Sequence, residues 1–352
     1  MKQENIYCLI LAGGIGNRLW PISNQKCPKQ FTDILNTGKS LIRQSFERIR
    51  QIIPDEYIYV ITGTEYASIT QEQLPEIPAQ NIIKEPFRRN TATSIMYAAA
   101  KIRKMAEDAT MVIIPSDHFI TNDLSYLQNI EKGVDYINEC RGLLTIGIEP
   151  TRIETQYGYI QVKDEKRSQV YAVKTFTEKP DRELAQKFFE SGDFLWNAGI
   201  FIWKVEDIIE EIKRHIYDLY VFFEDDSLLN TDQEEEFIRN TYGECPSSSI
   251  DFAVLERSSN VFVLKGDFGW SDVSTWHTYQ ALNWKDASEN TANTAGVVFQ
   301  DARDCVVNVP EDKKVVVCGV DNLIIAEKDG YLMVCNKDYE EQVKLFENKF
   351  KR

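Results

Sequence analysis

The first 150 residues alternate between short continuous apolar runs and longer segments with helical spacing. Residues 6–12 form a near-continuous apolar run that ends in Gly13-Gly14, which is typical of a buried strand in a parallel sheet. Further strands are predicted at 57–61, 111–114 and 143–148, and helices at 40–53, 92–105 and 124–140. This alternation predicts a Rossmann-like, doubly wound α/β sheet.

The pattern changes twice in the rest of the chain. Strands are predicted at 159–162 and 170–176, and helices near 182–191, 205–223 and 233–242. After about residue 290, five short β-rich runs are separated by turn pairs such as Pro310-Glu311 and Asp329-Gly330, and a helix is expected from Tyr339 to Phe350. We therefore predict an α/β domain over residues 1–288 and a small β-rich domain with a terminal helix over residues 289–352.

Composition narrows the class of protein. The 352 residues carry a net charge of −15, which argues against binding nucleic acid or an acidic membrane. The apolar runs are too short to span a membrane, and the N-terminus has no signal-peptide cleavage pattern. Seven scattered cysteines without a C-x-x-C pair, and only three histidines, argue against a disulfide framework or a zinc site. We expect a cytoplasmic protein.

Cations gather around a glycine turn near the N-terminus. Residues 1–50 hold eight Lys or Arg against three acidic residues, although the chain as a whole is acidic. The turn Gly13–Arg18 directly follows the first strand, so its backbone N–H groups can approach phosphate oxygens. It does not fit G-x-G-x-x-G, because Leu19 stands at the third glycine position. The P-loop pattern also fails, because Asp33 stands where its first glycine is required.

The run LAGGIGNRLWPIS, followed by PKQF at 28–31, resembles the signature of the sugar-phosphate nucleotidyltransferases, particularly the mannose-1-phosphate guanylyltransferases. The resemblance implies a mixed sheet of the nucleotide-diphospho-sugar transferase type. It also implies a C-terminal β domain like a short left-handed β-helix.

A second motif, Glu85-Pro86 with Arg89-Asn90-Thr91-Ala92, is similar to the family's EPxxRNTA, although Thr93 stands where proline is usual. Asn90 or Thr91 can also be a helix N-cap, and the two interpretations are compatible. The resemblance implies that the nucleotide is bound by Leu11, Ala12, Gly13, Gly14, Gly16, Asn17, Arg18, Lys29, Glu85, Arg89, Asn90, Thr91, Ala92 and Ser116.

Two aspartates follow the same resemblance. Asp117 ends a predicted buried strand, where α/β folds place ligand groups, and it matches the Mg²⁺ ligand of the family. GWSDVSTW at 269–276 resembles GWSDVGxW, with Ser274 in place of glycine, and implies Asp272 as the second Mg²⁺ carboxylate. Asp267 is the nearby alternative. His118 is not expected to be a general base, because a phosphate nucleophile is already ionised.

Three further motifs, at 157–160, 177–180 and 196–201, resemble the family's sugar-phosphate pocket. They imply that Gly158, Glu178, Lys179, Asn197 and Gly199 bind the sugar phosphate; carboxylate and amide groups suit sugar hydroxyls. Ser249–Glu256 resembles the family's SIDxAVxE, but its periodicity also fits core packing with Ser249 as a cap.

The resemblance implies that GTP and mannose 1-phosphate give GDP-mannose and pyrophosphate, with Mg²⁺ as cofactor and Arg18, Lys29, Asp117 and Asp272 as catalytic residues. A homodimer is expected, and the end of the chain at Arg352 predicts transferase activity alone. The alternatives are a guanylyltransferase for another sugar 1-phosphate and a catalytically inactive sugar-nucleotide sensor. The sequence decides neither the sugar nor the strictness for GTP.

Overall fold

The computed structural model describes residues 5–167 and 169–350, which divide into two compact units. Unit 1 contains the residues up to Gly13, Phe46–Ser116 and Ile120–Trp270. Unit 2 contains Gly14–Ser45, Asp117–Phe119 and the residues from Ser271 onward. The domain boundary predicted at residues 288–289 stays a prediction, and it falls within unit 2.

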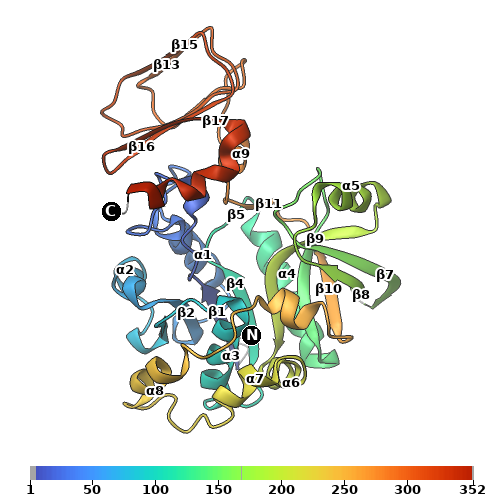
Figure 1. Ribbon diagram of the computed structural model, residues 1–352. Coiled ribbons are helices and arrows are strands. Elements are labelled where there is room, and N and C mark those ends of the chain that lie inside the picture. Colours follow the sequence, from blue (N-terminus) through green and yellow to red (C-terminus); the bar gives the residue numbers. More distant parts are fainter. Residues whose placement is uncertain (1–4, 168, 351–352) are drawn as a thin grey trace. The chain divides into compact units, whose positions relative to one another are not determined.

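Unit 1 is built on a nine-stranded mixed sheet with the order β3-β2-β1-β4-β9-β6-β10-β8-β7. The predicted Rossmann-like mixed sheet is confirmed. Strands β3, β2, β1 and β4 run parallel, and Figure 1 shows β2, β1 and β4 side by side. The long strand β9 lies antiparallel between β4 and β6. The strands are β1 (Ile6–Leu11), β2 (Ile58–Gly63), β3 (Ile82–Glu85), β4 (Thr110–Pro115), β6 (Leu143–Ile148), β7 (Tyr159–Arg167), β8 (Val170–Thr177), β9 (Phe194–Lys204) and β10 (Val261–Gly266).

Helices lie against this sheet. Successive side chains of a strand point to opposite faces of the sheet. Tyr7 and Leu9, two residues apart in β1, therefore lie on the same face, where they share one core with buried residues of α3 and α6. Helix α4 packs so closely on β6 and β9 that a side chain at Gly133 would collide with Leu144 and Ile202. The helices are α1 (Leu41–Ile49), α2 (Ala67–Gln73), α3 (Asn90–Arg103), α4 (Asp123–Cys140), α5 (Arg182–Ser191), α6 (Val205–His215), α7 (Tyr217–Tyr220) and α8 (Glu234–Thr241).

Several predicted elements have different limits in the structure. The helix predicted over 40–53 ends at Ile49, after which Gln51 and Ile52 make i→i−3 hydrogen bonds before Pro54. The helix predicted over 205–223 is broken at Ile216, whose backbone is not helical. Strands β9 and β10 and helix α9 (Trp276–Leu282) were not predicted.

Unit 2 combines the N-terminal signature with the β-rich end of the chain. Strands β12 (Thr291–Ala292), β14 (Val306–Asn308) and β16 (Leu323–Lys328) are parallel, and β17 (Tyr331–Asn336) returns antiparallel to β16; β13 (Val297–Gln300) pairs in parallel with β15 (Val315–Cys318). The predicted strand-rich C-terminal region is confirmed, whereas its likeness to a short left-handed β-helix stays a prediction. The helix predicted from Tyr339 to Phe350 corresponds to two 3₁₀ segments, Lys337–Leu345 and Glu347–Phe350, rather than to one continuous helix.

One hydrophobic core joins the two parts of unit 2. Leu19, Trp20 and Ile22 of the signature pack with side chains from α9, β14, β16 and β17. Short strands β5 (His118–Ile120) and β11 (Trp270–Asp272) form a separate two-stranded sheet. All seven cysteines are unpaired. Within residues 5–167 and 169–350, the helices lack the length and apolar character that crossing a membrane requires.

Candidate active site

The glycine turn begins in unit 1, at the carboxyl end of β1. The Ala12 N–H donates to the Ile61 carbonyl at 2.9 Å, and the Ser116 N–H donates to the Leu11 carbonyl at 3.1 Å. Gly13 lies against Glu85: a Cβ here would stand 3.1 Å from a Glu85 carboxylate oxygen. These contacts bring together five of the predicted nucleotide-binding positions at the ends of three parallel strands, where α/β folds bind ligands.

The turn continues into unit 2, where glycine is required at one position. Gly16 has φ +68°, and a Cβ there would stand 2.5 Å from Cγ of Lys29. The turn is closed by Gln30, whose Nε2 donates to the Gly14 carbonyl at 2.8 Å. Glycine is therefore required at position 16 for two reasons: it adopts the left-handed backbone conformation, and it leaves room for the Lys29 side chain. Asn17 and Arg18 follow in a single 3₁₀ turn, Asn17–Leu19.

Lys29 lies between two carboxylates. Its Nζ is 2.8 Å from Oδ2 of Asp117 and 3.2 Å from Oδ1 of Asp272, and it also donates to the Val273 carbonyl at 3.2 Å. The side chain of Lys29 is 8% exposed. Three residues that lie far apart in the sequence thus converge on one point; we call them the lysine cluster.

Burial and charge act in opposite directions on the lysine cluster. Burial alone would lower the pKa of Lys29, but the Asp117 and Asp272 carboxylates raise it above its ordinary value. Burial alone would raise the pKa of Asp272, but Lys29, His118 and the Ser274 hydroxyl lower it below its ordinary value. The ammonium and the Asp272 carboxylate therefore both stay charged at neutral pH.

The donor set of this cluster suits a hard divalent cation. Two carboxylates already converge on one cationic group, and Mg²⁺ is commonly bound by one or two carboxylates with waters and substrate phosphates. Among the described residues, three or more His, Cys, Asp or Glu side chains do not gather at any candidate metal site. A metal at Asp117 and Asp272 would therefore need ligands from a phosphate group or water.

Unit 1 holds the EPxxRNTA motif. Glu85 is buried and accepts hydrogen bonds from Ser94 Oγ at 2.5 Å and from the Tyr242 hydroxyl. Burial raises the pKa of Glu85 above its ordinary value. The Nε of Arg89 is buried and has no hydrogen-bond partner among residues 5–167 and 169–350. This site therefore offers one buried carboxyl group and one unsatisfied guanidinium nitrogen.

The start of α3 is linked to the segment that precedes Asp251. Thr91 Oγ1 accepts from the Ile250 N–H at 2.9 Å, and the Ala92 N–H donates to the Ser248 carbonyl at 3.1 Å. Asn90, at φ +62°, accepts from its neighbour's N–H through Oδ1, which is a local contact rather than a standard N-cap. The unusual Thr93 donates to the Pro246 carbonyl at 2.8 Å, a bond that proline cannot make.

The predicted sugar-phosphate residues also lie together in unit 1. Asn197 N–H donates to the Gly158 carbonyl at 2.8 Å, and a Cβ at Gly158 would stand 3.3 Å from Oε2 of Glu178. Lys179 forms an ion pair with Glu178. Asn197 Oδ1 accepts from Thr145 Oγ1 at 3.0 Å and from the Gly199 N–H at 3.1 Å. These bonds fix the orientation of the Asn197 amide.

Asp251 belongs to this group, although the sequence favoured a packing role for its segment. Asn197 Nδ2 donates to Oδ1 of Asp251 at 2.9 Å. Burial, together with the nearby Glu178 charge, raises the pKa of Asp251 to about 7. Ser249 has the capping role that was predicted, because its Oγ accepts from the Phe252 N–H. We call Glu178, Asn197 and Asp251 the amide cluster.

Comparisons with known proteins agree with this geometry. Residues 7–289 match the family described as nucleotidyl transferase. Mannose-1-phosphate guanylyltransferase RfbM of Salmonella typhimurium is 34% identical over 98% of this chain and 72% of its own. Alginate biosynthesis protein AlgA of Pseudomonas fluorescens is 34% identical over 96% of this chain and 70% of its own.

A solved structure extends the likeness to the fold. A crystal structure described as mannose-1-phosphate geranyltransferase, from Thermus thermophilus, has a TM-score of 0.87 and 28% identity. The likeness covers 99% of this chain and 100% of the other. The predicted resemblance is confirmed, and the chain belongs to the nucleotidyl transferase family.

Proposed function

We propose that this protein transfers GMP from GTP to mannose 1-phosphate, giving GDP-mannose and pyrophosphate. The observation that carries the proposal is the convergence of Lys29, Asp117 and Asp272 in a member of the nucleotidyl transferase family. A relative named mannose-1-phosphate guanylyltransferase, alignable over nearly the whole chain, supports the choice of substrates.

The reaction is an in-line displacement at the α-phosphorus of GTP. A phosphate oxygen of mannose 1-phosphate forms the new P–O bond, and the bond from the α-phosphorus to the bridging oxygen of the β-phosphate breaks. That oxygen leaves with pyrophosphate. Because the attacking phosphate is already ionised, no general base is needed, and catalysis consists of positioning and charge neutralisation.

The residues divide this work between them. Lys29 and Arg18 neutralise negative charge on the triphosphate and on the departing pyrophosphate, and the amides of Gly13, Gly14 and Gly16 orient the phosphates. Glu85, Arg89, Asn90 and Thr91 bind the guanosine part. Glu178, Lys179, Asn197, Gly158 and Gly199 hold the sugar phosphate.

A divalent metal ion is general in this family, and we propose Mg²⁺ here, held by Asp117 and Asp272. The bound ion would supply Lewis-acid stabilisation of phosphate charge. The two carboxylates also orient the Lys29 ammonium, so replacing either one disturbs both the metal and the lysine. We further propose that the protein is cytoplasmic and acts as a homodimer.

The test is pyrophosphate release by the purified protein. GTP, ATP, UTP and dTTP are each presented with mannose 1-phosphate, with and without Mg²⁺, and GTP is then paired with other sugar 1-phosphates. The proposal expects release with GTP and mannose 1-phosphate that stops when Mg²⁺ is removed. Release with ATP, UTP or dTTP but not with GTP would contradict the proposal. Preference for another sugar 1-phosphate would favour the related guanylyltransferase, and GDP-mannose binding without turnover would favour the sensor.

A further inference from the structure

Lys29 lies on a segment with little regular structure of its own. Residues 22–32, which we call the Lys29 loop, contain a single 3₁₀ turn, Lys29–Phe31. Asn24 shapes the first half of the loop, because its Oδ1 accepts from the N–H groups of Lys26 and Cys27 at 2.9 and 3.0 Å. A loop with only one 3₁₀ turn needs contacts from elsewhere in the unit to hold a catalytic side chain in one place.

The tip of the β16–β17 hairpin provides such contacts. Asp329 and Gly330 have φ +53° and +81°, and Lys328 pairs with Tyr331 across the turn. Two central residues with positive φ form the two-residue turn that matches strand twist, so the hairpin tip is a well-defined support. Tyr331 packs on Trp20, with ring centroids 5.5 Å apart, and Trp20 precedes the start of the loop by two residues.

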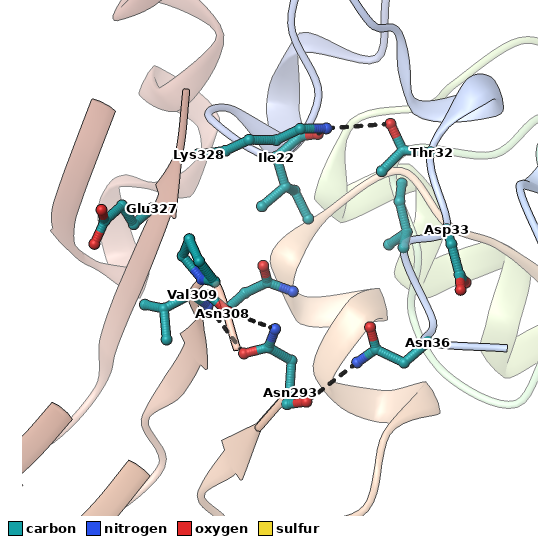
Figure 2. Close-up of a pocket in the computed structure, with 11 residues that line it drawn as sticks. Ile22, Thr32, Asp33, Asn36, Asn293, Asn308, Val309, Glu327 and Lys328 are labelled. Atoms are coloured by element: carbon teal, nitrogen blue, oxygen red, sulfur yellow. Dashed lines mark hydrogen bonds between the residues drawn. The ribbon is translucent and has the colours of Figure 1, made fainter. Parts of the chain in front are cut away.

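Polar contacts from this tip reach both ends of the Lys29 loop. Lys328 Nζ donates to the Ile22 carbonyl at 2.8 Å and to Thr32 Oγ1 at 3.4 Å. Figure 2 shows the Lys328 side chain extended toward Thr32. Asp329 Oδ2 accepts from Asn24 Nδ2 at 3.1 Å, which orients the amide that shapes the loop. One ammonium group therefore joins the first and the last residue of the loop.

A cavity borders both ends of the Lys29 loop, although Ile22 also packs in the core of unit 2. Thr32 and Ile22 line a cavity of about 190 Å³, together with Asn36, Asn293 and Lys328 (Figure 2). Side chains that border a cavity lack contact atoms on that side. On the cavity side, the hydrogen bonds of Lys328 restrain the first and the last residue of the loop where packed side chains are lacking.

We infer that Lys328 is a positioning residue for Lys29: from the hairpin tip it holds both ends of the Lys29 loop, so the C-terminal β strands take part in nucleotidyl transfer. The inference rests on the proposed function only for its kinetic part. The restraint on the loop can be measured without any turnover.

The experiment compares Lys328→Met, Lys328→Arg and Lys314→Met in the full chain. Lys314 is an exposed lysine of the same β-rich region and is the matched control. Hydrogen exchange of peptides covering residues 22–32 reports on the loop, thermal unfolding reports on the fold, and kcat and KM come from pyrophosphate release. Displacing a catalytic group by about 1 Å can cost about 100-fold in rate, so we expect a partial loosening in Lys328→Met to lower kcat about tenfold.

We expect Lys328→Met to speed exchange in residues 22–32 and to lower kcat, with KM for mannose 1-phosphate changed less than about twofold because its proposed binding groups lie outside the Lys29 loop. Lys328→Arg should recover most of kcat, and Lys314→Met should match the wild type. Wild-type exchange in Lys328→Met would overturn the inference, as would an equal loss in Lys314→Met. If the wild type released no pyrophosphate, the proposed function would fail while the exchange result still tested the restraint.

Discussion

The lysine cluster and the amide cluster place the same chemical group in opposite electrostatic states. In the first, Asp272 lies beside an ammonium, and its carboxyl pKa is lowered despite burial. In the second, Asp251 lies beside an amide and a second carboxylate, and its pKa is raised to about 7. Burial raises the pKa of both carboxyl groups. The Lys29 charge outweighs burial at Asp272, whereas the Lys179 charge does not outweigh it at Asp251.

This contrast separates two kinds of recognition. A charged carboxylate pair around an ammonium suits phosphate and metal chemistry, in which charge must be neutralised during reaction. A carboxyl group that hydrogen-bonds to an oriented amide suits neutral hydroxyls, which both donate and accept. The proposed assignments of phosphate transfer to the lysine cluster and of the sugar to the amide cluster follow from it, and the variants below test them.

The largest effect is expected from Lys29→Met, which removes the countercharge from the lysine cluster. By analogy with the loss of one preorganised electrostatic donor, kcat should fall about 100-fold or more. Steady-state pyrophosphate release with saturating GTP and mannose 1-phosphate measures it, with Lys314→Met as the control. Wild-type turnover in Lys29→Met would remove Lys29 from catalysis.

The next largest effect concerns the metal. Asp272→Asn keeps the shape of the side chain but removes its charge, so the Mg²⁺ concentration for half-maximal rate should rise about tenfold or more, tenfold being the lower end of the range for loss of a partner that only orients a metal ligand. Asp267→Asn is the matched control, because Asp267 was the alternative ligand predicted from the sequence. A Mg²⁺ titration that shifted in Asp267→Asn and not in Asp272→Asn would reverse the assignment.

Motifs next to buried parallel strands could be predicted well. The run at 6–12 and the strands near 58 and 111 are continuous apolar segments followed by turn residues, and this pattern belongs to parallel strands. Strand β9 was missed because Asn197 and Gly199 interrupt its apolar run. Asn197 is explained by its partners Asp251 and Thr145, and the Gly199 N–H donates to Asn197 Oδ1. Tertiary contacts, rather than local preference, decide such a strand.

The same limit explains two site residues that the sequence did not indicate. Asp251 lies in a segment whose periodicity fits core packing, and its contact with Asn197 spans 54 positions of the chain. Lys328 lies 306 positions from Ile22, so its role depends on the hairpin geometry. A sharp turn at Asp329-Gly330 could be predicted, whereas the direction of the neighbouring lysine could not.

A smaller effect is expected from Asn197→Asp in the amide cluster. The substitution places a carboxyl oxygen against Asp251 where Nδ2 now donates, so the hydrogen bond that orients this group is lost. Such a bond contributes about 0.5 to 1.5 kcal/mol, and about 1.4 kcal/mol corresponds to tenfold in affinity. We expect KM for mannose 1-phosphate to rise about tenfold while KM for GTP stays constant. Equal changes in both would indicate that the variant disturbs the fold rather than the sugar site.

The smallest effect is on stability and follows from the Asp251 pKa. The carboxyl titrates at about 7 in the folded protein and near about 4 when unfolded, so the folded state holds the extra proton between these values. The contribution of Asp251 to the free energy of unfolding therefore decreases as pH rises from about 4 to 7, the opposite of the contribution from Asp272, whose lowered pKa costs stability as pH falls. Asp251→Asn should remove this dependence.

In thermal unfolding, the difference in Tm between wild type and variant should change between pH 5 and pH 8, with the wild type losing relative stability at the higher pH. A constant difference would show that Asp251 does not titrate in this window, and the contrast between the two clusters would then rest on hydrogen bonding alone.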